Sequence, residues 1–117
     1  MIKTDILIIG AGPTGLFAVF EAGLLKLKCH LIDSLPMPGG QCAEIYPKKP
    51  IYDIPSHPEI LAGDLVKNLE KQRAPFQPTY TLGESAISLV KADDNNFLVT
   101  TNKGTQHLAP VVVIAGG

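Results

Sequence analysis

Two short, almost continuous apolar runs near the start of the chain predict buried parallel strands. The first run covers residues 5–9 and the second covers residues 29–32. Parallel strands have this pattern because both faces of their sheet are covered. Between the two runs, apolar residues recur at three- and four-residue intervals over residues 13–26, which predicts a helix. The first 33 residues therefore predict a βαβ unit with parallel strands and a right-handed crossover.

The pattern changes after residue 33. Proline and glycine interrupt residues 34–58, and the apolar residues in this stretch favour a loop that packs against another part of the chain. The helix expected next covers residues 64–73, with Leu61, Leu65 and Leu69 on one face, and ends before a proline.

The last third of the chain predicts strands at residues 79–82, 86–91, 97–101 and 105–108. Turn residues separate the last three of these, which predicts a three-stranded antiparallel meander. A final apolar run at residues 111–115 has the pattern of another buried parallel strand. The whole chain therefore predicts an α/β, doubly wound, Rossmann-like fold, with a parallel sheet and the meander as one crossover.

Composition narrows the classes of function. The 117 residues are 45% hydrophobic and 18% charged, which argues against disorder, and no apolar run is long enough to span a membrane. The net charge is −1 and Arg73 is the only arginine, so a nucleic-acid surface or a polybasic membrane patch is not expected. Cys29 and Cys42 form neither a disulfide framework nor a metal motif, which suits a reducing cytoplasm.

The sequence GAGPTG directly follows the first predicted strand and opens the predicted helix, so it matches the G-x-G-x-x-G fingerprint in the right context. Gly10 permits the tight turn, Gly12 lets a diphosphate approach the backbone, and Gly15 allows close packing of helix on sheet. Pro13 suits the first helical turn, and Thr14 offers a hydroxyl donor. Free amide groups at the helix start then face the anion, which predicts a dinucleotide site.

Asp33 ends the second strand, 23 positions after Gly10. A carboxylate there accepts hydrogen bonds from ribose hydroxyls and repels a 2′-phosphate, which leaves FAD or NAD as the cofactor. The adjacent glycines Gly39 and Gly40 expose backbone N–H groups to the diphosphate or flavin side, and Gln41 offers both a donor and an acceptor. A proline- and glycine-rich loop at this point favours FAD over NAD.

Residues 5–62 resemble the FAD domain of the thioredoxin-reductase-like (type 2) ferredoxin–NADP reductases. The matching stretches are residues 5–17, 31–36, 39–41, 46–47 and 51–55, and the likeness continues through 64–66, 75–76 and 82–84 to the last strand. The resemblance implies that Asp33 binds the adenosine ribose and that Gln41 lies near the flavin or its ribityl chain. It also implies that Tyr46 places its ring against the isoalloxazine and that the backbone of Ala86 meets adenine.

The function implied by the resemblance is electron transfer from NADPH through FAD to ferredoxin or flavodoxin, in a homodimer. Residues 1–117 would then be the N-terminal segment of the FAD-binding domain, without the NADP domain and the C-terminal return, and inactive alone. The sequence offers no catalytic acid or base and no metal site, and the histidines at 30, 57 and 107 are expected to be structural. Three alternatives stay open: a thioredoxin reductase, whose cysteine pair lies in the nicotinamide domain; a non-catalytic flavin or nucleotide-binding module; and an NAD-dependent dehydrogenase domain.

Overall fold

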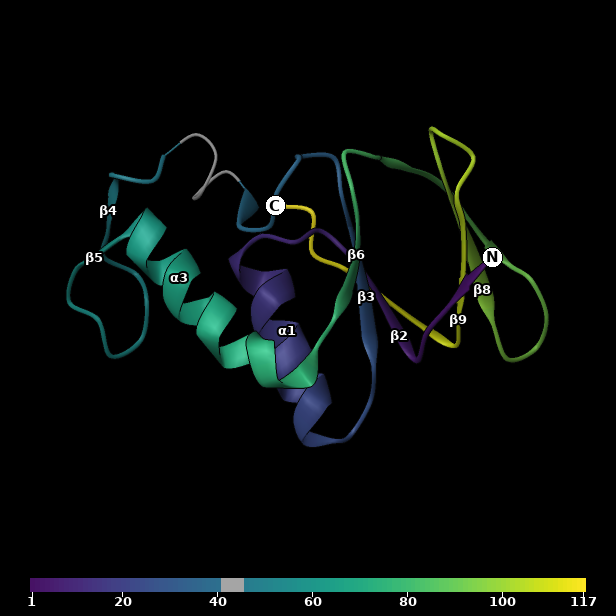
Figure 1. Ribbon diagram of the computed structural model, residues 1–117, viewed down its shortest axis with the longest axis horizontal. Coiled ribbons are helices and arrows are strands. Elements are labelled where there is room, and N and C mark those ends of the chain that lie inside the picture. Colours follow the sequence, from purple (N-terminus) through teal and green to yellow (C-terminus); the bar gives the residue numbers. More distant parts are fainter. Residues whose placement is uncertain (41–45) are drawn as a thin grey trace.

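A parallel sheet lies at the centre of the computed structural model, which describes residues 1–40 and 46–117 (Figure 1). Its four strands lie in the order β10 (Val111–Ile114), β2 (Ile6–Ile9), β3 (Cys29–Asp33) and β6 (Thr79–Leu82). The strands predicted at residues 5–9 and 29–32 are confirmed, and so is their parallel pairing, in which Ile8 lies opposite Leu31. The βαβ unit that begins the chain is therefore present.

A layer of helices lies on one face of this sheet. Helix α1 (Pro13–Leu24) begins with proline at its first position, and α3 (Ala62–Arg73) packs against α1 and gives way to the 3-10 turn η1 (Ala74–Phe76). Leu65 and Leu69 are buried as expected, but Leu61 is 41% exposed because it precedes α3 in an extended conformation. Within the described residues no helix has the length and apolarity needed to cross a membrane.

A second sheet covers the other face. It contains the predicted meander as β7 (Ala86–Lys91), β8 (Phe97–Thr101) and β9 (Gln106–Ala109), which pair antiparallel. The two-residue strand β1 (Ile2–Lys3) joins β9 in parallel, and it was not predicted because two residues carry no period. In Figure 1 the helices lie to the left of the parallel sheet and the meander to its right. The fold therefore differs from a doubly wound one, since a sheet replaces the second helical layer.

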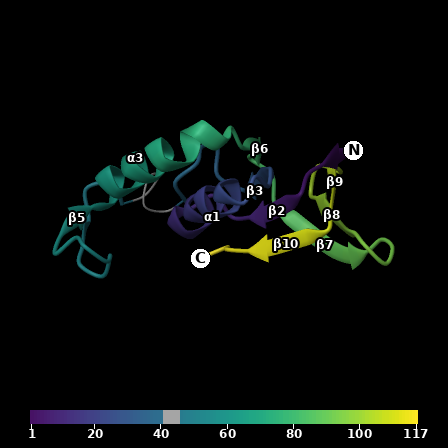
Figure 2. The same ribbon diagram turned by 90° about the horizontal axis from the view of Figure 1, so that it is seen from below.

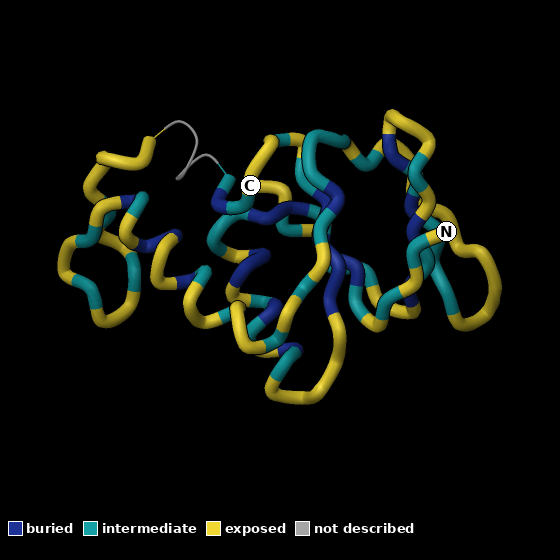
Figure 3. Tube along the Cα trace, viewed as in Figure 1, coloured by how far each residue is buried: buried dark blue, intermediate teal, exposed yellow. Residues whose placement is uncertain are grey.

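Successive side chains of the central strands β2 and β3 pack into two different hydrophobic cores, one on each face of the parallel sheet. Ile8 and Leu31 are fully buried against the helices, whereas Leu7 and Ile32 are buried against Val99 and Ala109 of the meander. This alternation follows from the two-residue period of a strand, which sends successive side chains to opposite faces. Figure 3 shows the buried residues concentrated where the layers meet.

Strand β10 departs from the expectation of a strand buried on both faces. Ile114 is 71% exposed and Val111 is 46% exposed. The reason is that β10 has the edge position in the described sheet and pairs with β2 alone (Figure 2). The apolar run therefore predicted a strand correctly, but the prediction that this strand is buried on both faces is wrong.

The described part of the proline-rich stretch packs against the helical layer, as its apolar residues predicted. Its short strand β4 (Pro50–Ile51) pairs antiparallel with β5 (Ile60–Leu61), which follows the stretch and directly precedes α3. Ile51, Ile54 and Ile60 are partly buried against the core formed by α1, α3 and the parallel sheet. This packing holds the loop beside the start of α3.

Buried histidines join the two sheets. His30 of β3 contacts Thr79 Oγ1 through Nδ1 (2.6 Å) and Thr81 Oγ1 through Nε2 (2.7 Å), and His107 Nε2 of β9 contacts the same Thr81 oxygen at 2.9 Å. His107 Nδ1 faces the carbonyl oxygen of Val99 at 3.4 Å. A carbonyl only accepts, so His107 carries its proton on Nδ1, Thr81 donates to its Nε2, and His30 Nε2–H donates to Thr81. His30 and His107 are therefore structural, as expected, and these hydrogen bonds define how they connect the two sheets.

This network is complete only when both histidines are neutral. The ring centroids of His30 and His107 lie 5.1 Å apart, so two imidazolium ions would repel each other and both would direct N–H groups at one hydroxyl. Burial, and then the nearby His107, lowers the pKa of His30 to about 4, and burial lowers the pKa of His107. Neutral rings therefore hold the meander to the parallel sheet.

The network predicts that acid weakens the contact between the parallel sheet and the meander. In the unfolded chain the histidine pKa is about 6.5, which is above the pKa of His30 in the folded protein. The contribution of neutral His30 to the free energy of unfolding is therefore fully present above pH 6.5 and is lost as the pH falls from 6.5 towards 4. After allowance for solvent screening we expect a loss of about 2 kcal/mol across this window. This loss of stability is measured by hydrogen exchange of the β6 and β9 amides in the complete protein, after correction for the intrinsic exchange rates. A His30→Gln variant should lose most of the pH dependence, and an equal dependence in both proteins would contradict the assignment.

Candidate functional site

The glycine fingerprint forms the turn from β2 into α1, and two of its glycines are fixed by close packing. Gly10 has φ +114°, and a Cβ there would lie 2.1 Å from the carbonyl oxygen of Ala115, just after β10. A Cβ on Gly15 would lie 2.0 Å from the carbonyl oxygen of Gly10. Both contacts are with backbone that cannot swing aside. These glycines therefore allow β2, α1 and the end of β10 to meet at one point.

Gly12 differs because the protein itself leaves room for a side chain. A Cβ on Gly12 would have Gly40 Cα as its nearest neighbour, at 3.9 Å, and its φ of −77° suits any residue. Gly12 caps α1 without a side-chain hydrogen bond, and the first turn holds no acidic residue. The open space thus lies beside amide groups at the positive end of a helix, where an anion is stabilised.

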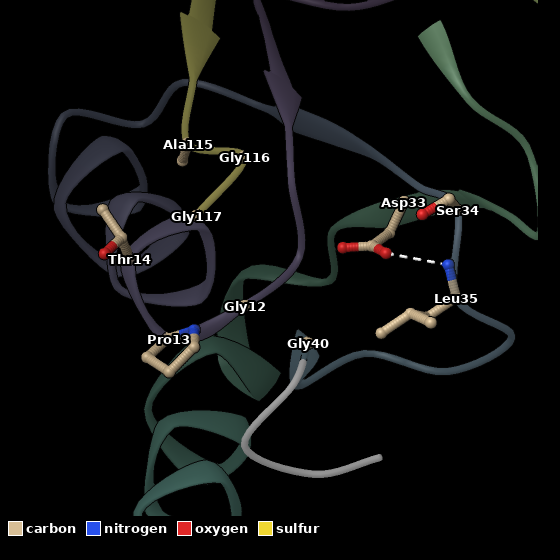
Figure 4. Close-up of a pocket in the computed structure, with 10 residues that line it drawn as sticks. All are labelled: Gly12, Pro13, Thr14, Asp33, Ser34, Leu35, Gly40, Ala115, Gly116 and Gly117. Atoms are coloured by element: carbon tan, nitrogen blue, oxygen red, sulfur yellow. Dashed lines mark hydrogen bonds between the residues drawn. The ribbon is translucent and has the colours of Figure 1, made fainter. Parts of the chain in front are cut away.

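A cavity of about 420 Å³ occupies this space (Figure 4). Its lining residues are Gly12, Pro13, Thr14, Asp33, Ser34, Leu35, Gly40 and residues 115–117. Figure 4 shows the Asp33 carboxylate pointing into the cavity from the end of β3, across from Gly12 and Pro13 at the start of α1. The volume is within the range of small-molecule sites. The fold therefore brings the predicted residues Gly12, Pro13, Thr14, Asp33 and Gly40 to one place.

Asp33 also holds the glycine turn in shape. Its Oδ2 accepts a hydrogen bond from the backbone N–H of Ala11 at 2.7 Å, and its Oδ1 accepts one from the N–H of Leu35 at 2.9 Å. A carboxylate offers about four acceptor positions, so two remain for the hydroxyls of a sugar. The spacing from the glycine fingerprint predicted the residue but not this supporting role, which depends on contacts made only after folding.

The loop after Asp33 rests on the fingerprint turn. The N–H of Gly39 donates to the carbonyl oxygen of Ala11 at 2.7 Å, and a Cβ on Gly40 (φ +61°) would lie 3.0 Å from Gly12 Cα. The expectation that Gly39 offers its N–H to a diphosphate is therefore wrong, because that group serves the turn. Gln41 lies outside the described residues.

A second cavity, of about 210 Å³, adjoins the first. The two share Asp33, Ser34 and Gly116 as walls, and the second is further lined by Ile9, Gly10, Ile32 and residues 84–86. Ala86 lies here, at the first position of β7. Two adjoining cavities that share a carboxylate suit an elongated ligand with a sugar at the junction.

Tyr46 does not line either of these cavities. The residue is 49% exposed, with Lys49 Nζ 5.4 Å from the ring centroid, and it borders a separate cavity of about 450 Å³ with Ile51 and Tyr52. Tyr46 is therefore not part of the hydrophobic core. Thr14 is exposed at the rim of the first cavity, where its hydroxyl is accessible.

The described chain offers no obvious redox thiol or metal centre. Burial, with Asp5 contributing, raises the pKa of the Cys29 thiol to about 11, so it stays protonated and unreactive. Across residues 1–40 and 46–117, no cluster of three His, Cys, Asp or Glu side chains has a metal-binding arrangement.

Comparison with known proteins places these features in a family context. Residues 8–64 match the model of the NAD(P)-binding Rossmann-like domain. The whole chain is 79% identical to part of the Christiangramia forsetii protein named ferredoxin–NADP reductase 2, and 69% identical to part of a ferredoxin–NADP reductase of Flavobacterium johnsoniae. In both cases it covers 33% of the relative, so the chain spans about a third of the length of the curated relatives it matches. The resemblance predicted from the motifs is confirmed.

Solved structures agree on the fold. Thioredoxin reductase from T. acidophilum superposes with a TM-score of 0.82 at 24% identity, over 100% of this chain and 36% of that one. A cyclohexanone monooxygenase superposes with a TM-score of 0.77, also at 24% identity, over 100% of this chain and 27% of that one. Identity this low shows the shared architecture alone, which confirms the Rossmann-like α/β prediction.

Proposed function

We propose, on the premise of its likeness to the ferredoxin–NADP reductases, that this chain is the N-terminal FAD-binding segment of such a reductase. The complete protein would pass electrons from NADPH through FAD to ferredoxin or flavodoxin. FAD, when bound, supplies the redox chemistry, and the protein supplies position and shielding. The observation that carries the proposal is the cavity between the uncapped start of α1 and the Asp33 carboxylate.

The residues fit a flavin dinucleotide in three ways. The amide groups at the start of α1 face the space that Gly12 leaves open, where a diphosphate would bind. Asp33 has acceptor capacity for the ribose and a charge that opposes a 2′-phosphate. The second cavity beside Ala86 gives a base room against a backbone wall.

Among reductases of this fold, the ferredoxin type is favoured over the thioredoxin type. The chain is 79% identical to the protein named ferredoxin–NADP reductase 2 but 24% identical to the superposed thioredoxin reductase from T. acidophilum. We also propose that the complete protein is a homodimer in the cytoplasm. The molar mass of the purified protein in solution tests the dimer, and cell fractionation tests the location.

The test uses the complete protein rather than the segment. We expect it to purify with the absorption spectrum of bound flavin and to reduce ferredoxin in the presence of NADPH. A protein that binds flavin but reduces only thioredoxin would favour the alternative enzyme. A colourless protein that binds neither flavin nor NADPH would contradict the proposal.

Gly12 gives a prediction that separates binding from folding. In Gly12→Ala the new methyl group meets no atom of the described residues closer than 3.9 Å, so we expect the free energy of unfolding to change by about 1 kcal/mol or less. The methyl group would occupy the space for the diphosphate, so FAD affinity should fall by about 10- to 100-fold. Fluorescence titration of the apoprotein with FAD measures the affinity, and unchanged affinity would show that the diphosphate lies elsewhere.

A further inference from the structure

Glu84 forms part of the second cavity, on the connection between β6 and β7. Its backbone N–H donates to the carbonyl oxygen of Asp33 at 3.2 Å, and the N–H of Gly83 donates to that of Leu35 at 3.1 Å. The connection therefore runs beside the end of β3, and residues 84–86 form one wall of the second cavity while the end of β3 forms another. No motif in the sequence predicted a role for Glu84.

The Glu84 side chain ties this connection to the turn between β8 and β9. Its Oε1 accepts hydrogen bonds from Thr101 Oγ1 at 2.6 Å and from Thr105 Oγ1 at 2.7 Å. The next residue adds a reciprocal pair, since Ser85 N–H donates to Asn102 Oδ1 at 3.0 Å and Asn102 N–H donates to the Ser85 carbonyl at 2.9 Å. Four hydrogen bonds thus connect residues 84 and 85 to the turn between β8 and β9.

The carboxylate suits this role at neutral pH. The two threonine hydroxyls hold the pKa of Glu84 below its usual range, so the side chain is ionised and accepts both bonds. Thr101 is almost fully buried, at 1% exposed, which fixes the position of one donor. The strand that follows is irregular at its start, with a register shift between Ala86 and Ser88, so ladder pairing alone does not set the wall of the cavity.

We propose that Glu84 is a positioning residue for the base end of the dinucleotide site. By anchoring the connection to Thr101 and Thr105, it holds the backbone of Ser85 and Ala86 where a planar base packs between them and the end of β3. The inference rests on the proposed function, and it assigns Glu84 an effect on the adenosine half of the cofactor alone.

The experiment compares ADP and FMN as competitors for FAD on the apo form of the complete protein. In Glu84→Leu both threonine hydroxyls lose their acceptor, and we expect ADP to bind about tenfold more weakly while FMN stays within about twofold of wild type. Glu84→Gln keeps an oxygen acceptor for both hydroxyls and should restore most of the ADP affinity. Thr105→Val removes one donor, leaves the carboxylate in place, and should weaken ADP binding by about threefold.

A matched control lies at the other end of the same hairpin. The carboxylate of Asp93 accepts a hydrogen bond from the backbone N–H of Asn95 at 2.8 Å, in the turn between β7 and β8. Asp93→Ala should loosen the hairpin without changing ADP affinity. Equal losses of ADP and FMN affinity in Glu84→Leu, unchanged ADP affinity, or no recovery in Glu84→Gln would each overturn the inference. Wild-type protein that binds neither ADP nor FMN would instead refute the proposed function on which it rests.

Discussion

Replacing Asp33 by alanine is expected to lower the affinity of the complete protein for FAD by on the order of 100-fold. The change removes the carboxylate that would accept the ribose hydroxyls, and it also leaves the backbone N–H groups of Ala11 and Leu35 without their acceptor. Each amide that stays unpaired costs about 1–3 kcal/mol, so the glycine turn should lose order as well. Flavin content after purification and FAD titration of the apoprotein measure the effect.

The matched change is Asp94→Ala, which removes an exposed carboxylate in the turn between β7 and β8. FAD affinity of that variant should equal that of wild type. Asp33→Asn provides an intermediate case, because one amide N–H would then face the new NH₂ group. Stoichiometric FAD in purified Asp33→Ala would contradict the role assigned to this residue.

Gly15→Ala is expected to destabilise the fold by about 3 kcal/mol or more. The added Cβ would lie 2.0 Å from the carbonyl oxygen of Gly10, so α1 must move away from β2. Alanine improves helix propensity by about 1 kcal/mol relative to glycine, which is too little to offset that clash. Thermal unfolding of the complete apoprotein should show a midpoint lower by about 5 °C or more.

Gly12→Ala serves as the control for Gly15→Ala because it adds the same methyl group to the same turn without the clash. The two variants should therefore separate, with Gly12→Ala folded but poor in FAD, and Gly15→Ala poorly folded. If Gly15→Ala unfolds at the wild-type temperature, close packing at this glycine is not what the fold requires.

The first βαβ unit was predictable because its signals are local. Apolar runs, helical spacing and the glycine fingerprint each act over a few residues, so β2, α1 and β3 lie where the pattern placed them. The exposure of Ile114 and the four-stranded form of the second sheet depend instead on which strands become neighbours. A single sequence does not display those pairings.

The site shows the same division. Asp33 was identified by its spacing from the fingerprint, but its bonds to Ala11 and Leu35 arise from the folded turn. Glu84 meets Thr101 and Thr105 across 17 and 21 residues, a separation at which no periodicity indicates a contact. Residue types therefore point to the ligand, while the supporting hydrogen bonds emerge from the tertiary structure.

A crystal structure of the complete protein with bound FAD most directly tests whether the start of α1 and Asp33 hold this cofactor. We predict diphosphate oxygens within about 3 Å of backbone N–H groups in the first turn of α1, and a ribose hydroxyl donating to the Asp33 carboxylate. FAD bound elsewhere, with the cavity beside Gly12 filled by protein side chains, would contradict the proposed site.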